Sequence, residues 1–231
     1  MKRGDFMKKH IEQLQKSMLF SNISAEDIKK MCTCLQLREK KIEKDEFVFH
    51  AGDVVNKVYL VISGSMHIVD EDFWGNRSLI ETMPAYTLFG EAYAISNTEE
   101  HLVSVVAAED AVVLELEPSC LTKPCPRGCE CHIEIIRNTE KILSIKIIRL
   151  TEKLGHIMKR STKEKVCSYL SKCARKNRSN RFCIPYSRQE LADYLCVERS
   201  ALSHELSKMT KHGIIRCRRN EFELLKIPNN L

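Results

Sequence analysis

The chain has 231 residues, and 43% of them are hydrophobic, which is enough for folded cores and excludes a disordered chain. That length fits one large domain or two small ones. The net charge of +6 is uneven, because residues 159–231 hold 17 Lys+Arg against 7 Asp+Glu and the remainder holds 20 against 24. Basic charge concentrated in the last third indicates a polyanion partner such as nucleic acid, with a solvated basic surface as the alternative.

Charged residues interrupt the N-terminal stretch, which therefore does not resemble a signal peptide. We expect a cytoplasmic protein with no membrane association. The chain contains 11 cysteines. In a reducing compartment these are expected to be free thiols, metal ligands or redox sensors rather than structural disulfides.

The N-terminal part changes from helical spacing to strand spacing. Residues 6–31 keep helical periodicity, and Ser24 to Asp27 forms a weak capping box before a second turn. Between Leu35 and Glu117, short apolar runs alternate with turn signals; the runs are residues 47–49, 58–62, 66–69, 78–80, 103–106 and 112–116. Many short strands at even spacing predict a sandwich or a small antiparallel barrel, which can enclose one small ligand.

A cysteine-rich loop follows between Pro118 and His132. Thiolate and imidazole are the ligands that zinc, iron–sulfur clusters and haem recruit. The spacing is Cys-x3-Cys-x-Cys rather than Cys-x2-Cys, and Cys32 and Cys34 could complete a set of ligands. Three interpretations stay open: a thiol redox switch, no ligand, or a metal or cluster site at Cys125, Cys129, Cys131 and His132.

The stretch from Ile133 to Met158 predicts one long helix with an a/d heptad seam. Only Glu140 interrupts the seam, which consists of Ile136, Leu143, Ile147, Leu150, Leu154 and Ile157. Such a seam is typical of a dimer interface, and a core helix of a single domain is the alternative. A second apolar stripe could pack on a neighbouring domain of the same chain; it consists of Ile135, Ile142, Ile145 and Ile148. We therefore predict a sensor domain over 1–132, a dimerisation helix over 133–158 and a third domain over 159–231.

The sequence of the third domain predicts a winged helix-turn-helix. Capping boxes at Ser161 and Ser187 start helices over 165–175 and 187–195, and a tight turn leads into a longer helix over 198–212. Gly213 ends that helix, and residues 214–226 form a hairpin. Two helices joined by a tight turn and followed by a hairpin are the architecture that reads double-stranded DNA.

The polar face of the longer helix contains the candidate base-reading residues: Arg199, Ser200, Ser203 and His204. They lie near the helix end that enters the major groove, and Arg199 is the candidate for a bidentate contact to guanine. Ser187 and Arg188, at the start of the shorter helix, are candidates for phosphate contacts. An ordinary solvent face is the alternative.

These motifs resemble the Crp-Fnr family of transcription regulators over nearly the full chain. Its helix-turn-helix signature is similar to residues 187–195, 199–206 and 213–215, and Phe89-Gly90-Glu91 resembles a landmark of its cyclic-nucleotide-binding barrel. The resemblance implies a homodimer, base reading by the four residues above, and contact with RNA polymerase if the protein is an activator. His204 stands where the family usually has Arg, and Cys196 where it often has Gly. If Cys196 needs a positive φ, the strain is roughly 1–2 kcal/mol.

The sensor domain lacks a feature of family members that bind cyclic AMP. There, an Arg-Ser pair that holds the cyclic phosphate follows the Gly-Glu pair by about ten residues. This chain keeps Gly90 and Glu91 but has His101 and Leu102 at that distance. A buried phosphate without a guanidinium partner is poorly compensated, so tight binding of cyclic AMP is not expected. The pocket at these four residues holds an unidentified small effector or nothing, and Glu91 is either an effector ligand or a turn-capping carboxylate.

We thus expect an α+β protein: an antiparallel barrel of the double-stranded β-helix or jelly-roll type, a long dimerisation helix and a winged helix-turn-helix. The expected function is a non-enzymatic transcription regulator that binds an inverted repeat. A cupin-like, metal-dependent barrel enzyme with an incidental basic domain is one alternative, but no His-x-His pair supports it. A sensor subunit that does not bind DNA, such as a kinase regulatory subunit, is another, and the base-reading face argues against it.

Overall fold

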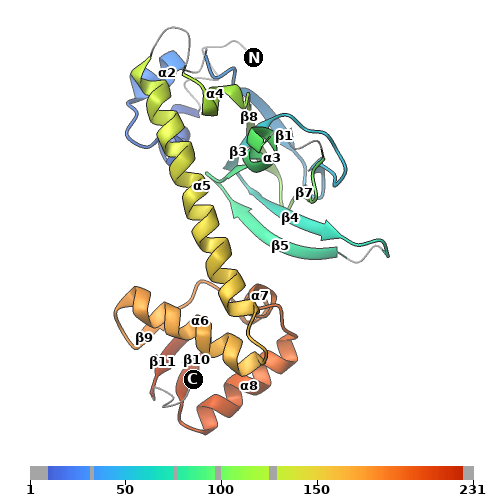
Figure 1. Cartoon of the computed structure of the whole chain (residues 1–231), viewed down its shortest axis with the longest axis vertical. Coiled ribbons are helices and arrows are strands. Elements are labelled where there is room, and N and C mark those ends of the chain that lie inside the picture. The colour runs from blue at the N-terminus through green and yellow to red at the C-terminus, as the bar shows by residue number, and fades with distance from the viewer. Residues whose placement is uncertain (1–9, 32–33, 75–76, 97–99, 125–128, 226–231) are drawn as a thin grey trace. The chain divides into compact units, whose positions relative to one another are not determined.

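The computed structural model describes residues 10–31, 34–74, 77–96, 100–124 and 129–225 (Figure 1). The chain divides into two compact units, Met1–Ser144 and Ile145–Leu231. The boundary falls inside the long helix α5, Glu130–Ile157. None of the helices in the described part of the chain combines the length and the apolar character that a membrane crossing needs.

The first unit is built on two four-stranded antiparallel sheets, with strand orders β1-β8-β3-β6 and β2-β7-β4-β5. The strands are β1 Arg38–Ile42, β2 Phe47–Phe49, β3 Val58–Ser63, β4 Ser65–Glu71, β5 Arg77–Pro84, β6 Leu88–Phe89, β7 Ser104–Ala107 and β8 Ala111–Leu116. Strand β3 is buried on both faces: Leu60 packs in a core shared with the helices, while Tyr59 and Val61 pack in a second core. The predicted antiparallel α+β architecture is confirmed.

Strand β1 is absent from the predicted set of apolar runs. Its sequence is largely charged, and only Ile42 is buried. The strand nevertheless pairs with β8 from Arg38 opposite Glu115 to Ile42 opposite Ala111. It lies at the edge of its sheet, where charged side chains face water and discourage pairing with another chain. Such a strand has no strong apolar periodicity to reveal it.

Short helices pack on the first core, in the part of the chain where residues 6–31 were expected to be helical with a second turn after Ser24. The described segments are helical residues 10–14, the 3-10 helix η1 Met18–Phe20 and α2 Ala25–Met31. Asn22 has a positive φ of 62° between the last two, which breaks the helix. The Ser24 hydroxyl accepts a hydrogen bond from the Asp27 amide at 3.1 Å, as the capping pattern predicts. The unit also contains α3 Glu91–Ser96 and α4 Ser119–Thr122.

The first half of α5 packs within the barrel unit. Ile135 and Ile142 are buried in the same core as Leu60, and the Asn138 amide donates to the carbonyl oxygens of Leu19 and Ser21. The predicted packing of the second stripe on a neighbouring domain is therefore confirmed for these two isoleucines. It is wrong for Ile148, whose side chain is 57% exposed. The helix also begins at Glu130 rather than at the predicted Ile133.

The second unit is a three-helix domain with a small sheet. Its helices are α6 Thr162–Asn177, α7 Arg188–Tyr194 and α8 Arg199–Lys211, and its strands are β9 Arg181–Cys183, β10 Ile215–Arg218 and β11 Glu221–Leu224. The three antiparallel strands form the wing sheet, in the order β10-β11-β9. Strand β9 has only three residues, which is too short for a periodic pattern, and Phe182 in it lies opposite Phe222 of β11.

Candidate nucleic-acid interface

The start and end of α7 are fixed by local sequence. The Ser187 side chain accepts from the Glu190 amide, and the Glu190 carboxylate accepts from the Ser187 amide, as a capping box requires. At the other end, the amides of Cys196 and Val197 donate back to Asp193 and Ala192. This pairing is a Schellman motif, whose C′ residue needs a left-handed backbone. Cys196 supplies it with φ of 51°.

Helix α8 presents one apolar face and one polar face. Leu202, Leu206 and Met209 are buried in the core of the unit. Of the four predicted base-reading residues, Arg199, Ser200 and His204 are exposed and Ser203 is half-buried. The helix ends at Lys211 with His212 as its C-cap, and Gly213 follows with a positive φ of 66°. An exposed arginine and imidazole near the helix start can both donate to acceptors on base edges.

Arg188 lies against the wing sheet. Its guanidinium donates to Cys217 Sγ at 3.3 Å and to the Arg219 carbonyl at 3.4 Å, and it lies 5.9 Å from the centre of the Phe222 ring. The side chain therefore ties the start of α7 to the wing. The prediction that Arg188 contacts phosphate did not include these contacts with the wing. Contacts between segments that lie far apart in the sequence cannot be inferred from the sequence alone.

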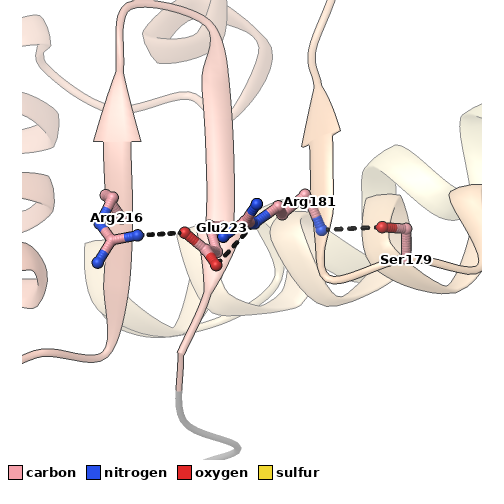
Figure 2. A network of polar contacts seen from close by, with 4 residues as sticks. All are labelled: Ser179, Arg181, Arg216 and Glu223. Atoms are coloured by element: carbon pink, nitrogen blue, oxygen red, sulfur yellow. Dashed lines mark hydrogen bonds and ion pairs between the residues drawn. The ribbon is translucent and has the colours of Figure 1, made fainter.

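Glu223 holds the wing sheet together on its outer face (Figure 2). Its carboxylate accepts from Arg181 on β9 and from Arg216 on β10, both at 2.7 Å. The hydrogen bond from Arg181 is the main reason that the pKa of Glu223 is lowered, and the charge of Arg216 adds to it. None of these three residues was predicted from the sequence, although Arg216 lies opposite Glu223 in the expected hairpin.

The candidate effector residues divide between the interior and the surface. Glu91 and His101 are buried, whereas the Leu102 side chain is 74% exposed. Gly90 has φ of 78°, and a side chain there would meet the Lys57 carbonyl at 3.1 Å. Only three of the four predicted residues therefore lie where they can face an interior site.

His101 is enclosed by aromatic rings. Tyr93 stacks on it at 4.2 Å between centroids, and Phe49 lies at 4.2 Å in a tilted arrangement. Its Nε2 is 3.2 Å from the Val55 carbonyl, and its Nδ1 has no hydrogen-bond partner among the described residues. His101, which stands at the distance from Glu91 where the resemblance implied an arginine, is thus a packed imidazole.

The cysteine loop is described only in part, and Cys125 lies outside the described residues. Cys129 and Cys131 are half-buried, and His132 is buried, which lowers the pKa of its imidazole. Across the described ranges of the chain, no three His, Cys, Asp or Glu side chains gather closely enough to hold a metal ion. Cys129, Cys131 and His132 therefore do not form a ligand set by themselves.

The predicted seam on α5 is largely uncovered within one chain. Ile147, Leu150 and Leu154 are 65%, 59% and 44% exposed. The remaining members, Ile136, Leu143 and Ile157, are half-buried. Three large aliphatic side chains at heptad spacing on the same exposed stripe favour a second helix as the partner.

Comparison with known proteins identifies both parts of the chain. The family model described as a cyclic nucleotide-binding domain matches residues 39–125, and the Crp-like helix-turn-helix domain matches residues 164–229. The nitrogen fixation regulation protein FixK of Bradyrhizobium diazoefficiens is 24% identical over 183 residues, which cover 77% of this chain and 74% of FixK. The transcriptional activator protein Anr of Pseudomonas protegens is 24% identical over 198 residues, 81% of this chain and 77% of Anr.

Two solved structures share the fold. FixK2 from Bradyrhizobium japonicum gives a TM-score of 0.53 at 18% identity, covering 82% of this chain and 93% of FixK2. The c-di-GMP responsive global regulator CLP of Xanthomonas campestris gives 0.58 at 18% identity, covering 88% of this chain and all of CLP.

Proposed function

We propose, from the premise that the chain belongs to the Crp-Fnr family of transcription regulators, that it acts as a homodimer on an inverted-repeat operator. The α8 helix of each protomer enters the major groove of one half-site. The two helices are then separated by one helical turn of DNA, about 34 Å. A cytoplasmic location and, for an activator, contact with RNA polymerase accompany this function.

The exposed seam of α5 is the observation that carries the proposal. Burying an aliphatic side chain of this size stabilises by roughly 1.5–3 kcal/mol. Ile147, Leu150 and Leu154 from each of two chains therefore supply a substantial driving force for association. A two-fold axis along the seam makes the interface self-complementary and relates the two DNA-binding units by symmetry.

Arg199 is proposed to read guanine, and His204 to set this protein's own half-site. The guanidinium matches the O6 and N7 acceptors of guanine in a bidentate contact. An imidazole donates at most two separate hydrogen bonds and has no fork, so it reads a base edge differently from the arginine usual in the family. Ser200 and Ser203 supply shorter contacts on the same face.

The barrel unit is proposed to sense a signal other than cyclic AMP. His101 packs between Tyr93 and Phe49 at the distance from Glu91 where the resemblance implies an arginine, and an imidazole lacks the guanidinium fork that pairs with a phosphate. An effector that binds one arrangement of the two DNA-binding units better than the other shifts their population. Zinc, an iron–sulfur cluster or haem at the cysteine loop would need ligands beyond Cys129, Cys131 and His132.

Charge reversal at one exposed residue tests the DNA-reading role. An operator is first selected from random duplexes by repeated enrichment on the wild-type protein. Arg199→Glu is expected to abolish specific binding while the dimer persists in light scattering. Lys211→Glu makes the same charge change at the far end of α8 and is expected to keep specificity. Specific binding that survives in Arg199→Glu would remove Arg199 from the interface.

A further inference from the structure

Lys165 on α6 makes a contact that the proposed function does not use. Its ammonium donates to the carbonyl oxygens of Leu195 at 3.2 Å and Cys196 at 3.1 Å. These residues are the C-cap of α7 and the left-handed residue after it. A lysine from a third helix thus holds the first residues of the turn between α7 and α8.

The two carbonyls suit a cation. The Schellman motif uses the amides of Cys196 and Val197 to pair carbonyls further back in α7, so the oxygens of Leu195 and Cys196 point out of the helix end. The C-terminal end of a helix carries partial negative charge, which an ammonium complements. Charge-assisted hydrogen bonds of this kind are stronger than neutral ones.

The first turn of α8 has no side-chain capping hydrogen bond and no buried side chain of its own. Glu198 occupies the N-cap position, but its side chain makes no capping hydrogen bond. The buried residues of α8 begin at Leu202, one turn into the helix. The backbone that leads into Arg199 and Ser200 continues directly from the turn that Lys165 contacts.

We propose that Lys165 is a positioning residue for DNA recognition: it fixes the α7–α8 turn and thereby the approach of Arg199 and Ser200 to the groove. The inference rests on the proposed DNA-reading role of α8. A basic residue in a DNA-binding unit is otherwise expected to contact phosphate. Here two of the three ammonium N–H groups donate to protein carbonyls, so Lys165 contributes to specificity through the turn rather than through a phosphate contact.

The two roles differ in their dependence on salt. Each phosphate contact adds close to one unit to the slope of log affinity against log salt, whereas a positioning contact adds none. Lys165→Met keeps the aliphatic stem and removes the ammonium. It is expected to weaken binding to the selected operator at least about ten-fold, because both charged hydrogen bonds to the turn are lost, with the salt slope and binding to random duplex unchanged.

Three further variants complete the test. Lys163→Met removes the same charge from an exposed site on α6 and is expected to leave the ratio of specific to non-specific affinity unchanged. Lys165→Arg keeps a cationic donor and is expected to recover most of the lost affinity. If Lys165→Met proves unfolded at the assay temperature, Lys165→Gln replaces it, since the amide can donate to one of the two carbonyls, and an intermediate loss is expected.

Different outcomes would contradict the role of Lys165 and the proposed DNA-binding function. A Lys165→Met or Lys165→Gln protein that is folded and binds the operator as the wild type does would overturn the inference. An equal loss on operator and random duplex with a slope lower by about one would assign Lys165 to phosphate and overturn it as well. A wild-type protein that enriches no duplex at all would instead contradict the proposed function.

Discussion

Cys196 illustrates how far a single residue can be interpreted from sequence. Its place in the turn predicts strain if the backbone is left-handed, and the structure gives φ of 51°. A residue with a β-carbon pays roughly 1–2 kcal/mol in that conformation, and glycine avoids it. The carbonyl that Lys165 binds belongs to the same residue. The strained backbone and the hydrogen bond from Lys165 therefore occur at the same residue.

Replacing Cys196 with glycine is expected to stabilise the DNA-binding unit by roughly 1 kcal/mol, because relief of the strain exceeds the entropy that glycine gains in the unfolded chain. Cys196→Ala keeps the β-carbon and is the matched control. The measurement is the urea midpoint of unfolding followed by circular dichroism. A glycine variant no more stable than the alanine variant would show that the left-handed backbone carries no strain.

His156 links stability to pH in the same unit. Its Nδ1 lies 2.8 Å from Ser168 Oγ, and its ring packs edge-on against Tyr169. Burial lowers the pKa of the imidazole below 6.5, and the charges of Lys172 and Lys159 act in the same direction while Glu152 opposes them. Burial also lowers the pKa of His132, which lies in the other unit.

The unfolded chain accordingly binds protons at His156 more readily than the folded one. The contribution of neutral His156 to the free energy of unfolding is fully present above about pH 6.5. It is lost as the pH falls from there toward the pKa of His156 in the folded protein. His156→Asn is expected to lose less stability than the wild type between pH 7 and pH 5, and exposed His204→Asn is expected to follow the wild type. Urea midpoints at the two pH values measure this. Equal losses in the wild type and His156→Asn would contradict a role for His156.

At the scale of single elements, the sequence predicted the strands and helices whose signals lie within one short segment. Short apolar runs indicated β3 and β8, and capping boxes located the starts of α6 and α7, which the structure confirms. Contacts between distant segments could not be predicted. The charged edge strand β1, the three-residue strand β9 and the enclosure of His101 depend on neighbours that lie far away in the sequence.

Helix α5 carries the prediction about assembly. Leu154→Glu places a charge on the exposed seam and is expected to shift the mass in light scattering from twice 26.7 kDa toward 26.7 kDa. A buried, unpaired carboxylate costs several kcal/mol at such an interface. Thr151→Glu adds the same charge at an exposed position of the same helix outside the seam, and its mass is expected to stay dimeric. A dimeric Leu154→Glu protein would place the interface elsewhere.

Glu223 on β11 accepts hydrogen bonds from arginines on the strands at both sides of it. Glu223→Gln removes the charge that attracts Arg181 and Arg216. It is expected to accelerate hydrogen–deuterium exchange of the β10 and β11 amides. Glu221→Gln makes the same change two residues away on the same strand and serves as control. Equal exchange in both variants would show that the two ion pairs do not hold the sheet.

At the scale of the whole molecule, the chain combines a sensing barrel and a DNA-reading unit that share one helix. The family comparison confirms the regulator function that charge asymmetry and the helix-turn-helix spacing predicted. The effector could not be predicted, because His101 and Leu102 depart from the cyclic-AMP pattern without matching another. The departure is itself informative, since His101 is packed inside the barrel rather than presented at its surface.

The number of chains bound to one operator duplex tests the central claim most directly. The selected inverted repeat is titrated with the wild-type protein in sedimentation velocity, beside a duplex that retains only one half-site. We expect two chains on the full operator, bound together, and a large loss of affinity on the half-site. A single chain that saturates the inverted repeat, with equal affinity for the half-site duplex, would contradict it.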